Sequence, residues 1–153
     1  MPQESVITPE LKALIGKESP PTSWLVDQSS IVEFAQALDD PNPLWNDEKE
    51  ARKSRFGGLI APPTFPAYLR NDQMHKMLFE LPTPLKRVLN GGNEIEWYQP
   101  IRPGDRITVT GKLIDLRERE GAMGRMLFVI SESTYANQFG EVVAKGRNTV
   151  IRY

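Results

Sequence analysis

The sequence predicts an α+β fold, with helices in the first half of its 153 residues and an antiparallel sheet in the second half. All 13 prolines fall at or before Pro103, so residues 104–153 are free to form the hydrogen-bond ladder of a sheet. Residues 8–80 instead carry apolar side chains at helical spacing behind capping residues. This length is typical of one domain, and we predict a single domain over residues 1–153.

Helix signals begin near the N-terminus. Thr8 before Pro9 predicts an N-cap followed by proline at the first helical position, and Gly16 ends this short helix. Ser30 and Glu33 predict a capping box for a second helix, whose apolar side follows the helical period at Ile31, Phe34, Ala35 and Leu38.

Two further helices are predicted before residue 81. A short one starts at Asn46 or Asp47 and runs to about Arg55. The longest spans residues 62–80, because its prolines lie in or before the first turn and its apolar residues, Phe65, Tyr68, Leu69, Met77 and Leu78, predict a buried central helix.

Four strands are predicted in the second half. Residues 95–101 form the first, between the Asn-Gly-Gly-Asn at 90–93 and the Arg-Pro-Gly-Asp turn at 102–105. Residues 107–113, 126–136 and 142–149 follow as an antiparallel meander, because they alternate or are rich in β-branched and aromatic residues. A sheet wrapped around one helix has an exposed edge, so we expect dimerisation through edge pairing.

Composition excludes several classes of function. Lys plus Arg at 19 against Asp plus Glu at 20 gives a formal charge of −1, which argues against nucleic acid as a partner. The sequence has no cysteine, and His75 is its only histidine, so we expect no metal site and no cofactor. The longest apolar run, residues 126–130, is far shorter than the roughly 20 residues of a membrane span. We expect no signal peptide, no membrane contact and a cytoplasmic location.

Residues 40–62 carry a recognisable motif. Asp40-Pro-Asn42-Pro-Leu is followed by Asp47, Ala51 and then Phe-Gly-Gly-Leu-Ile-Ala-Pro at 56–62. This stretch resembles the MaoC-like hydratase/dehydratase family of the hotdog fold, whose motif runs Asp-x-Asn-Pro-Leu-His, a short helix, then Phe-Gly-(Gly/Lys)-x-Ile-Ala. The Ala-Pro-Pro-Thr-Phe ending is most similar to the N-terminal MaoC dehydratase domain of heteromeric and double-hotdog members. The resemblance implies a long central helix wrapped by an antiparallel sheet, and an acyl-CoA or acyl-carrier-protein thioester as the bound molecule.

The resemblance also implies a site. In the family, the motif Asp and His hold a water for addition across an enoyl thioester, and a backbone N–H at the start of the central helix polarises the thioester carbonyl. Asp40 stands at the motif Asp, Asn42 at the motif Asn, and Trp45 at the motif His. Substrate contacts are expected at Asn42, Trp45, Ile60, Ala61, Pro62, Pro63 and Thr64.

Two departures from the motif predict a non-catalytic half. An indole N–H donates but does not titrate, so Trp45 cannot replace the acid–base histidine. Pro63 stands where catalytic members typically have glycine, and proline has no N–H to donate, so the oxyanion donor either comes from Thr64 or is absent.

Structural roles compete with these functional ones. Asp40 could be a loop carboxylate and Asn42 a turn former, while Trp45 could fill the volume of the missing imidazole or stack on substrate.

The leading hypothesis is a hotdog subunit of an (R)-specific enoyl-thioester hydratase or 3-hydroxyacyl-thioester dehydratase, paired with a chain that bears the Asp and His. The alternatives are a homodimeric enzyme that uses Asp40 and a non-catalytic acyl-thioester-binding protein.

Overall fold

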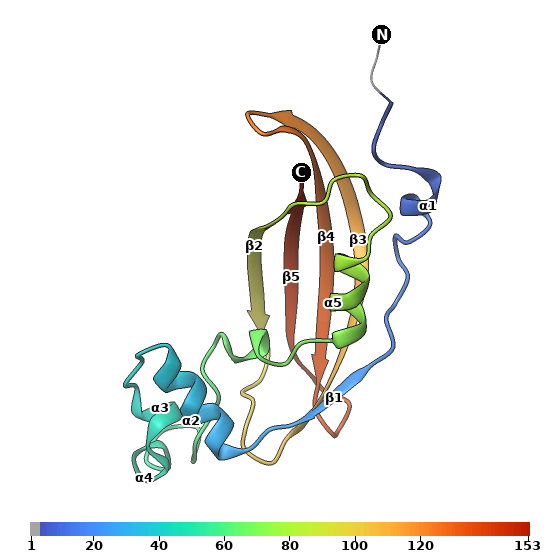
Figure 1. Cartoon of the computed structure of the whole chain (residues 1–153). Helices are drawn as coiled ribbons and strands as arrows, with labels where there is room; N and C mark the ends of the chain where they lie inside the picture. The colour runs from blue at the N-terminus through green and yellow to red at the C-terminus, as the bar shows by residue number, and fades with distance from the viewer. Residues whose placement is uncertain (1–3) are drawn as a thin grey trace.

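The computed structural model describes residues 4–153, which form a curved five-stranded antiparallel sheet with one short helix, Asp72–Phe79, lying against it (Figure 1). The strand order is β1-β3-β4-β5-β2. The strands are β1 (Thr22–Leu25), β2 (Val88–Trp97), β3 (Arg106–Gly121), β4 (Gly124–Ala136) and β5 (Val142–Arg152). The predicted meander is confirmed, because β3 pairs with β4 and β4 with β5 along almost their whole lengths.

Two features of the sheet differ from the sequence prediction. The short edge strand β1 had no clear signal, and β2 begins at Val88 and ends at Trp97 rather than spanning 95–101. Gly91 and Gly92 lie within β2, at a bulge, where the sequence predicted a boundary. A Cβ on Gly91 would lie 3.0 Å from both Ile151 Cγ1 and the Thr149 carbonyl oxygen, so the close approach of β5 accounts for glycine here.

The helices are α1 (Pro9–Lys12), α2 (Gln28–Ala37), α3 (Pro43–Asn46), α4 (Glu48–Ala51) and α5 (Asp72–Phe79), with a 3₁₀ turn at Phe65–Ala67. Thr8 caps α1 as predicted, by accepting from the Leu11 N–H at 3.2 Å. The predicted capping box of α2 is wrong, because Asp27 is the N-cap and accepts from the Ser30 N–H at 2.7 Å. The predicted helix from 46 or 47 to 55 is also shorter than expected, since α4 ends at Ala51.

The long central helix predicted over residues 62–80 is broken. Asn71 interrupts it, with its side chain 5% exposed. The Asn71 amide donates to the carbonyl oxygens of Pro20 at 2.8 Å and Val109 at 2.7 Å, and its oxygen accepts from the Met74 N–H at 2.8 Å. These bonds fix Asn71 outside the helix, so α5 begins at Asp72 and covers only the part of the sheet near β3 and β4 (Figure 1).

The core has two clusters on the helix-facing side of the sheet. One surrounds Ile31, Phe65 and Ile107 beneath α2 and the 3₁₀ turn, and the other surrounds Leu11, Met74 and Leu113 beneath α1 and α5. In Figure 1, α2, α3 and α4 gather beyond the end of β2, away from α5. No helix within residues 4–153 has the length and apolar character that crossing a bilayer requires.

Candidate functional site

Asp40 is positioned by the way α2 ends. The Asp39 N–H donates to the Gln36 carbonyl at 3.0 Å and the Asp40 N–H to the Ala35 carbonyl at 3.0 Å, which is the pattern of a Schellman motif. Asp39 has φ 53°, the left-handed conformation that this motif requires and that Asp tolerates better than most residues. The half-buried Asp40 carboxylate then accepts from the Asn42 N–H at 3.1 Å, so one of its oxygens closes a turn.

Asn42 starts the next helix. Its side-chain oxygen accepts from the Leu44 N–H at 3.0 Å, which makes it the N-cap of α3 with Pro43 in the first turn. The Asn46 amide donates to the carbonyl oxygens of Asp40 at 2.6 Å and Asn42 at 2.8 Å. The polar side chains of the motif are therefore engaged with the local backbone.

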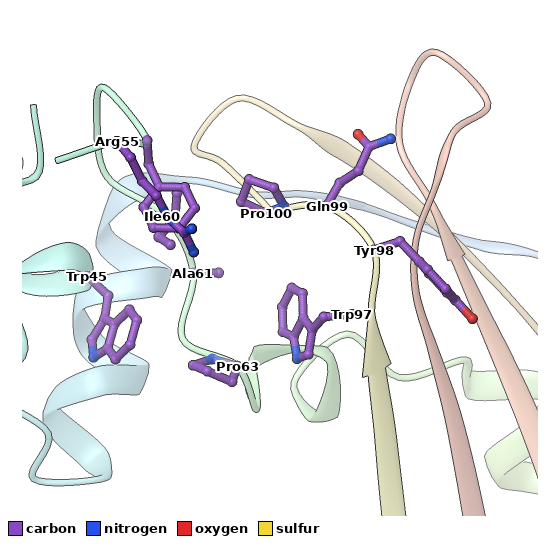
Figure 2. Close-up of a pocket in the computed structure, with 10 residues that line it drawn as sticks. Trp45, Arg55, Ile60, Ala61, Pro63, Trp97, Tyr98, Gln99 and Pro100 are labelled. Carbon is purple, nitrogen blue, oxygen red and sulfur yellow. The ribbon is translucent and has the colours of Figure 1, made fainter.

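Trp45 lies where the resemblance places the motif histidine, and it is buried, with 8% of its surface exposed. Among the buried side-chain nitrogen and oxygen atoms of residues 4–153, Trp45 Nε1 is the one without a hydrogen-bond partner. Figure 2 shows the six-membered ring of the indole turned toward Pro63, with the nitrogen on the opposite side. The indole therefore forms an apolar wall, and its N–H is not directed at the pocket.

The segment from Leu59 to Thr64 has few backbone N–H groups that are free to donate a hydrogen bond to a substrate. The N–H groups of Leu59, Ile60 and Ala61 are bonded to Glu48 Oε2, the Leu44 carbonyl and the Ile101 carbonyl. Pro62 and Pro63 have no N–H. The Thr64 N–H has no backbone acceptor among the described residues, and it precedes the 3₁₀ turn that replaces the start of the central helix.

Glu48 holds the two halves of the motif together. One of its oxygens accepts from the Leu59 N–H at 3.0 Å and the other from Arg52 Nε at 2.9 Å. These bonds, the one from Arg52 first, lower the pKa of the Glu48 carboxyl below its ordinary value.

A cavity of about 370 Å³ lies beside Trp45. Figure 2 shows Trp45 on one side, Trp97 at the end of β2 on the other, and Pro63 and Ala61 between them. The full lining is Trp45, Arg55, Phe56, Ile60, Ala61, Pro63, Trp97, Tyr98, Gln99 and Pro100. Ten residues from three segments thus form one pocket, and four of the ten are aromatic.

Of the residues expected to touch substrate, the pocket brings together Trp45, Ile60, Ala61 and Pro63. Asp40, Asn42, Pro62 and Thr64 do not line it. The sequence prediction missed Arg55, Phe56 and residues 97–100. The only sequence signal for residues 97–100 was their place between a strand and the turn at 102–105.

A second hollow, of about 440 Å³, lies between α5 and the part of the sheet that α5 leaves uncovered. His75 and Phe79 of α5 form one side, and their rings are 4.6 Å apart between centroids. Its floor carries Ser131, Ser133 and Asn148 on β4 and β5. The described residues contain no group of three or more His, Asp or Glu side chains arranged to hold a metal ion.

Comparison with known proteins identifies the family. A model described as the FAS1-like, dehydratase domain region matches residues 13–146. The chain belongs to this family. A UPF0336 protein of Saccharopolyspora erythraea is 33% identical to this chain over 144 residues, and the alignment covers 92% of this chain and 89% of the relative.

Solved structures support the same assignment. The MaoC-like dehydratase from Rhodospirillum rubrum is 29% identical with a TM-score of 0.71, over 94% of this chain and 95% of that one. The HadBC (3R-hydroxyacyl-ACP dehydratase) complex from Mycobacterium tuberculosis has a chain with a TM-score of 0.77 and 20% identity, over 90% of this chain and 96% of that one, a likeness of fold. The expected hotdog fold and membership of the MaoC-like family are confirmed. The structure differs from the expected architecture in that the short α5 replaces the long central helix.

Proposed function

We propose that this chain is the substrate-binding or scaffold half of an (R)-specific enoyl-thioester hydratase or 3-hydroxyacyl-thioester dehydratase. A second MaoC-like chain with an intact Asp and His carries out the chemistry on an acyl-CoA or acyl-carrier-protein thioester. The observation that carries this proposal is the buried indole of Trp45 at the histidine position, next to a motif whose Asp40 and Asn42 serve the local backbone.

The chemistry of hydration explains why these residues do not suffice. Adding water across the double bond needs one group that removes a proton from water and one that delivers a proton to carbon. A carboxylate and an imidazole can exchange protons near neutral pH, whereas an indole N–H only donates a hydrogen bond. Asp40 does not reach the pocket beside Trp45, so this chain offers neither a pair nor a shared water site there.

Stabilisation of the enolate oxygen is also weak on this chain. A preorganised N–H at the start of a helix is the usual donor in this kind of reaction. Pro62 and Pro63 remove two such donors, and the remaining one, Thr64, begins a three-residue 3₁₀ turn with no long helix behind it.

The sheet leaves a place for the partner. β2 is an edge strand, and among the strands of residues 4–153 it pairs only with β5. Val88 and Leu89 of β2 and the nearby Phe79 of α5 expose apolar side chains. Such an edge can pair with a strand of another chain. A hotdog partner at this edge agrees with the heteromeric similar structure described above, and an assembly of this kind should bury more than roughly 1,000 Å².

Activity of the separated and combined chains tests the proposal. We expect this chain alone to hydrate crotonyl-CoA poorly, and addition of a MaoC-like subunit with an intact Asp-x-Asn-Pro-x-His to raise the rate. Because acid–base groups contribute about 100- to 10,000-fold, the difference is easy to measure. Fast turnover by this chain alone that is abolished by Asp40→Asn would favour the homodimeric enzyme instead.

Restoring the motif tests the alignment of the site. Trp45→His returns a titratable group, and Pro63→Gly returns a backbone N–H. We expect weak activity from each single variant and a more than additive gain from the double variant, because groups that act on one transition state are coupled. Strictly additive or absent effects in folded protein would show that the motif segment is not the site.

A further inference from the structure

The tryptophan at the motif-histidine position, Trp45, does not fill the pocket that it lines. A cavity of about 370 Å³ lies beside Trp45, and six of its ten lining residues lie outside the set that the family motif predicts to contact substrate. We propose that this pocket is a ligand site of the chain itself, and that it takes a small, flat, unsaturated carboxylate whose carboxyl group is held by Arg55.

The walls favour a flat molecule. Trp45 and Trp97 face the pocket from opposite sides, with Pro63 and Ala61 between them (Figure 2). Phe56 adds a third aromatic ring. Aromatic side chains offer large, rigid apolar faces, which pack well against a conjugated or aromatic group.

Arg55 supplies the charge. Its guanidinium lies 4.7 Å from the centroid of the Phe56 ring, and Figure 2 shows the side chain extending toward Ala61. The neighbouring cations are already paired, Arg52 with Glu48 at 2.9 Å and Lys53 with Glu50 at 2.7 Å. Arg55 forms no ion pair with any of residues 4–153, so its donors remain free for an anion.

The polar side chains of Gln99 and Tyr98 in the lining already have hydrogen-bond partners. The Gln99 amide donates to Glu141 Oε2 at 2.6 Å. The Tyr98 hydroxyl is bonded to Glu96, which raises the pKa of Tyr98, and both side chains point away from Trp45 in Figure 2. None of the ten lining residues is acidic. An anion is therefore favoured over a cation, and the planar guanidinium matches the two oxygens of a carboxylate.

The volume argues for a small ligand. Pockets for small molecules span about 300 to 1,000 Å³, so this one lies near the lower limit. A free acid of one ring or a short conjugated chain fits this range better than a whole acyl thioester. The proposed ligand binds this chain without a partner subunit, so the inference does not depend on the proposed hydratase role.

Binding of trans-cinnamate to the isolated chain tests the proposal by titration calorimetry, with quenching of tryptophan fluorescence as a second readout. We expect saturable binding to the wild type and a dissociation constant at least about tenfold larger for Arg55→Gln, because a charge-assisted hydrogen bond is lost. Arg52→Gln is the matched control, since it removes the same charge three residues away and outside the pocket. We expect it to bind like the wild type. The neutral analogue cinnamamide should bind the wild type about as weakly as cinnamate binds Arg55→Gln.

Three results would overturn the proposal. The first is no saturable binding of cinnamate to the wild type at millimolar concentration. The second is equal affinity of the wild type and Arg55→Gln, with circular dichroism showing both folded. The third is displacement of cinnamate by adenosine 3′,5′-bisphosphate at lower concentration than cinnamate itself requires, which would assign the pocket to the nucleotide of coenzyme A.

Discussion

Two asparagine-containing segments of this protein differ in what their side chains support. In the motif segment, residues 40–46, Asn42 caps a four-residue helix, and the hydrogen-bond partners of Asp40 and Asn42 among residues 4–153 all lie within six residues of them in sequence. At the helix break, Asn71 bonds to carbonyl groups 38 and 51 residues away in sequence and also caps α5. The hydrogen bonds of the first segment are local, whereas those of Asn71 connect an N-terminal segment, a strand and a helix.

This difference shows that a residue's match to a family motif and its contribution to the stability of the fold are separate properties. Asp40 and Asn42 match a family motif, but their contacts are those of ordinary turn and cap residues. Asn71 matches nothing in the motif, yet it is buried and satisfies two backbone acceptors at once. A residue that a motif marks as functional is not always the one on which the fold depends.

The largest expected effect is that of Asn71→Ala. The variant removes a cap and leaves the Pro20 and Val109 carbonyls without their donor, so we expect the free energy of unfolding to fall by about 2–4 kcal/mol. Urea unfolding followed by circular dichroism measures the loss. A loss no greater than that of Asn42→Ala would remove the distinction between the two segments.

Asn42→Ala should have a smaller effect. It removes one N-cap bond on a four-residue helix near the surface, for which we expect a loss of about 1 kcal/mol. The same urea experiment gives the value. A loss above that of Asn71→Ala would mean that the motif segment has long-range importance that its contacts do not reveal.

As the pH falls, the motif segment should lose protection from hydrogen exchange at a higher pH than the region around Asn71 does. The folded-state pKa of Glu48 is lowered, so its contribution is fully present above its unfolded-state pKa, about 4.3, and is lost as pH falls through the folded-state pKa. Hydrogen exchange of the Leu59 amide, which donates to Glu48, should lose protection over that acidic range. The Met74 amide, which donates to the non-titrating Asn71, should keep its protection there.

Glu48→Gln is the control for the acid experiment. It removes the titrating group but keeps an acceptor oxygen, so protection of the Leu59 amide should become less dependent on pH over the same range. If the Leu59 and Met74 amides lose protection together in the wild type, the protein opens as one unit under acid.

The smallest expected effect is that of Asp40→Asn on the combined enzyme. Since the proposed chemistry belongs to the partner chain, the rate of crotonyl-CoA hydration by the pair should stay within about twofold, against the 100-fold or greater loss typical of a missing acid–base group. Steady-state kinetics with matched protein concentrations gives the ratio. A 100-fold loss would return Asp40 to a catalytic role.

The sequence by itself determined the features that depend on neighbouring residues. The Thr8 cap and the β3-β4-β5 meander follow from local spacing, turn chemistry and strand period, whereas the motif segment was recognised by its resemblance to a family. Four pocket residues, Trp45, Ile60, Ala61 and Pro63, were also expected, because they lie in or next to that motif.

Only the tertiary structure decided the break at Asn71, the place of Gly91 inside β2 and the far wall of the pocket at Trp97. Each of these features depends on residues that are distant in sequence. The Asn71 side chain bonds to the carbonyl groups of Pro20 and Val109, and Gly91 packs against the backbone of β5. Trp97 lines the same pocket as Trp45. Helical period over residues 62–80 is a local preference. It gives way because a buried amide that satisfies two remote carbonyls contributes more free energy than one continuous turn of helix.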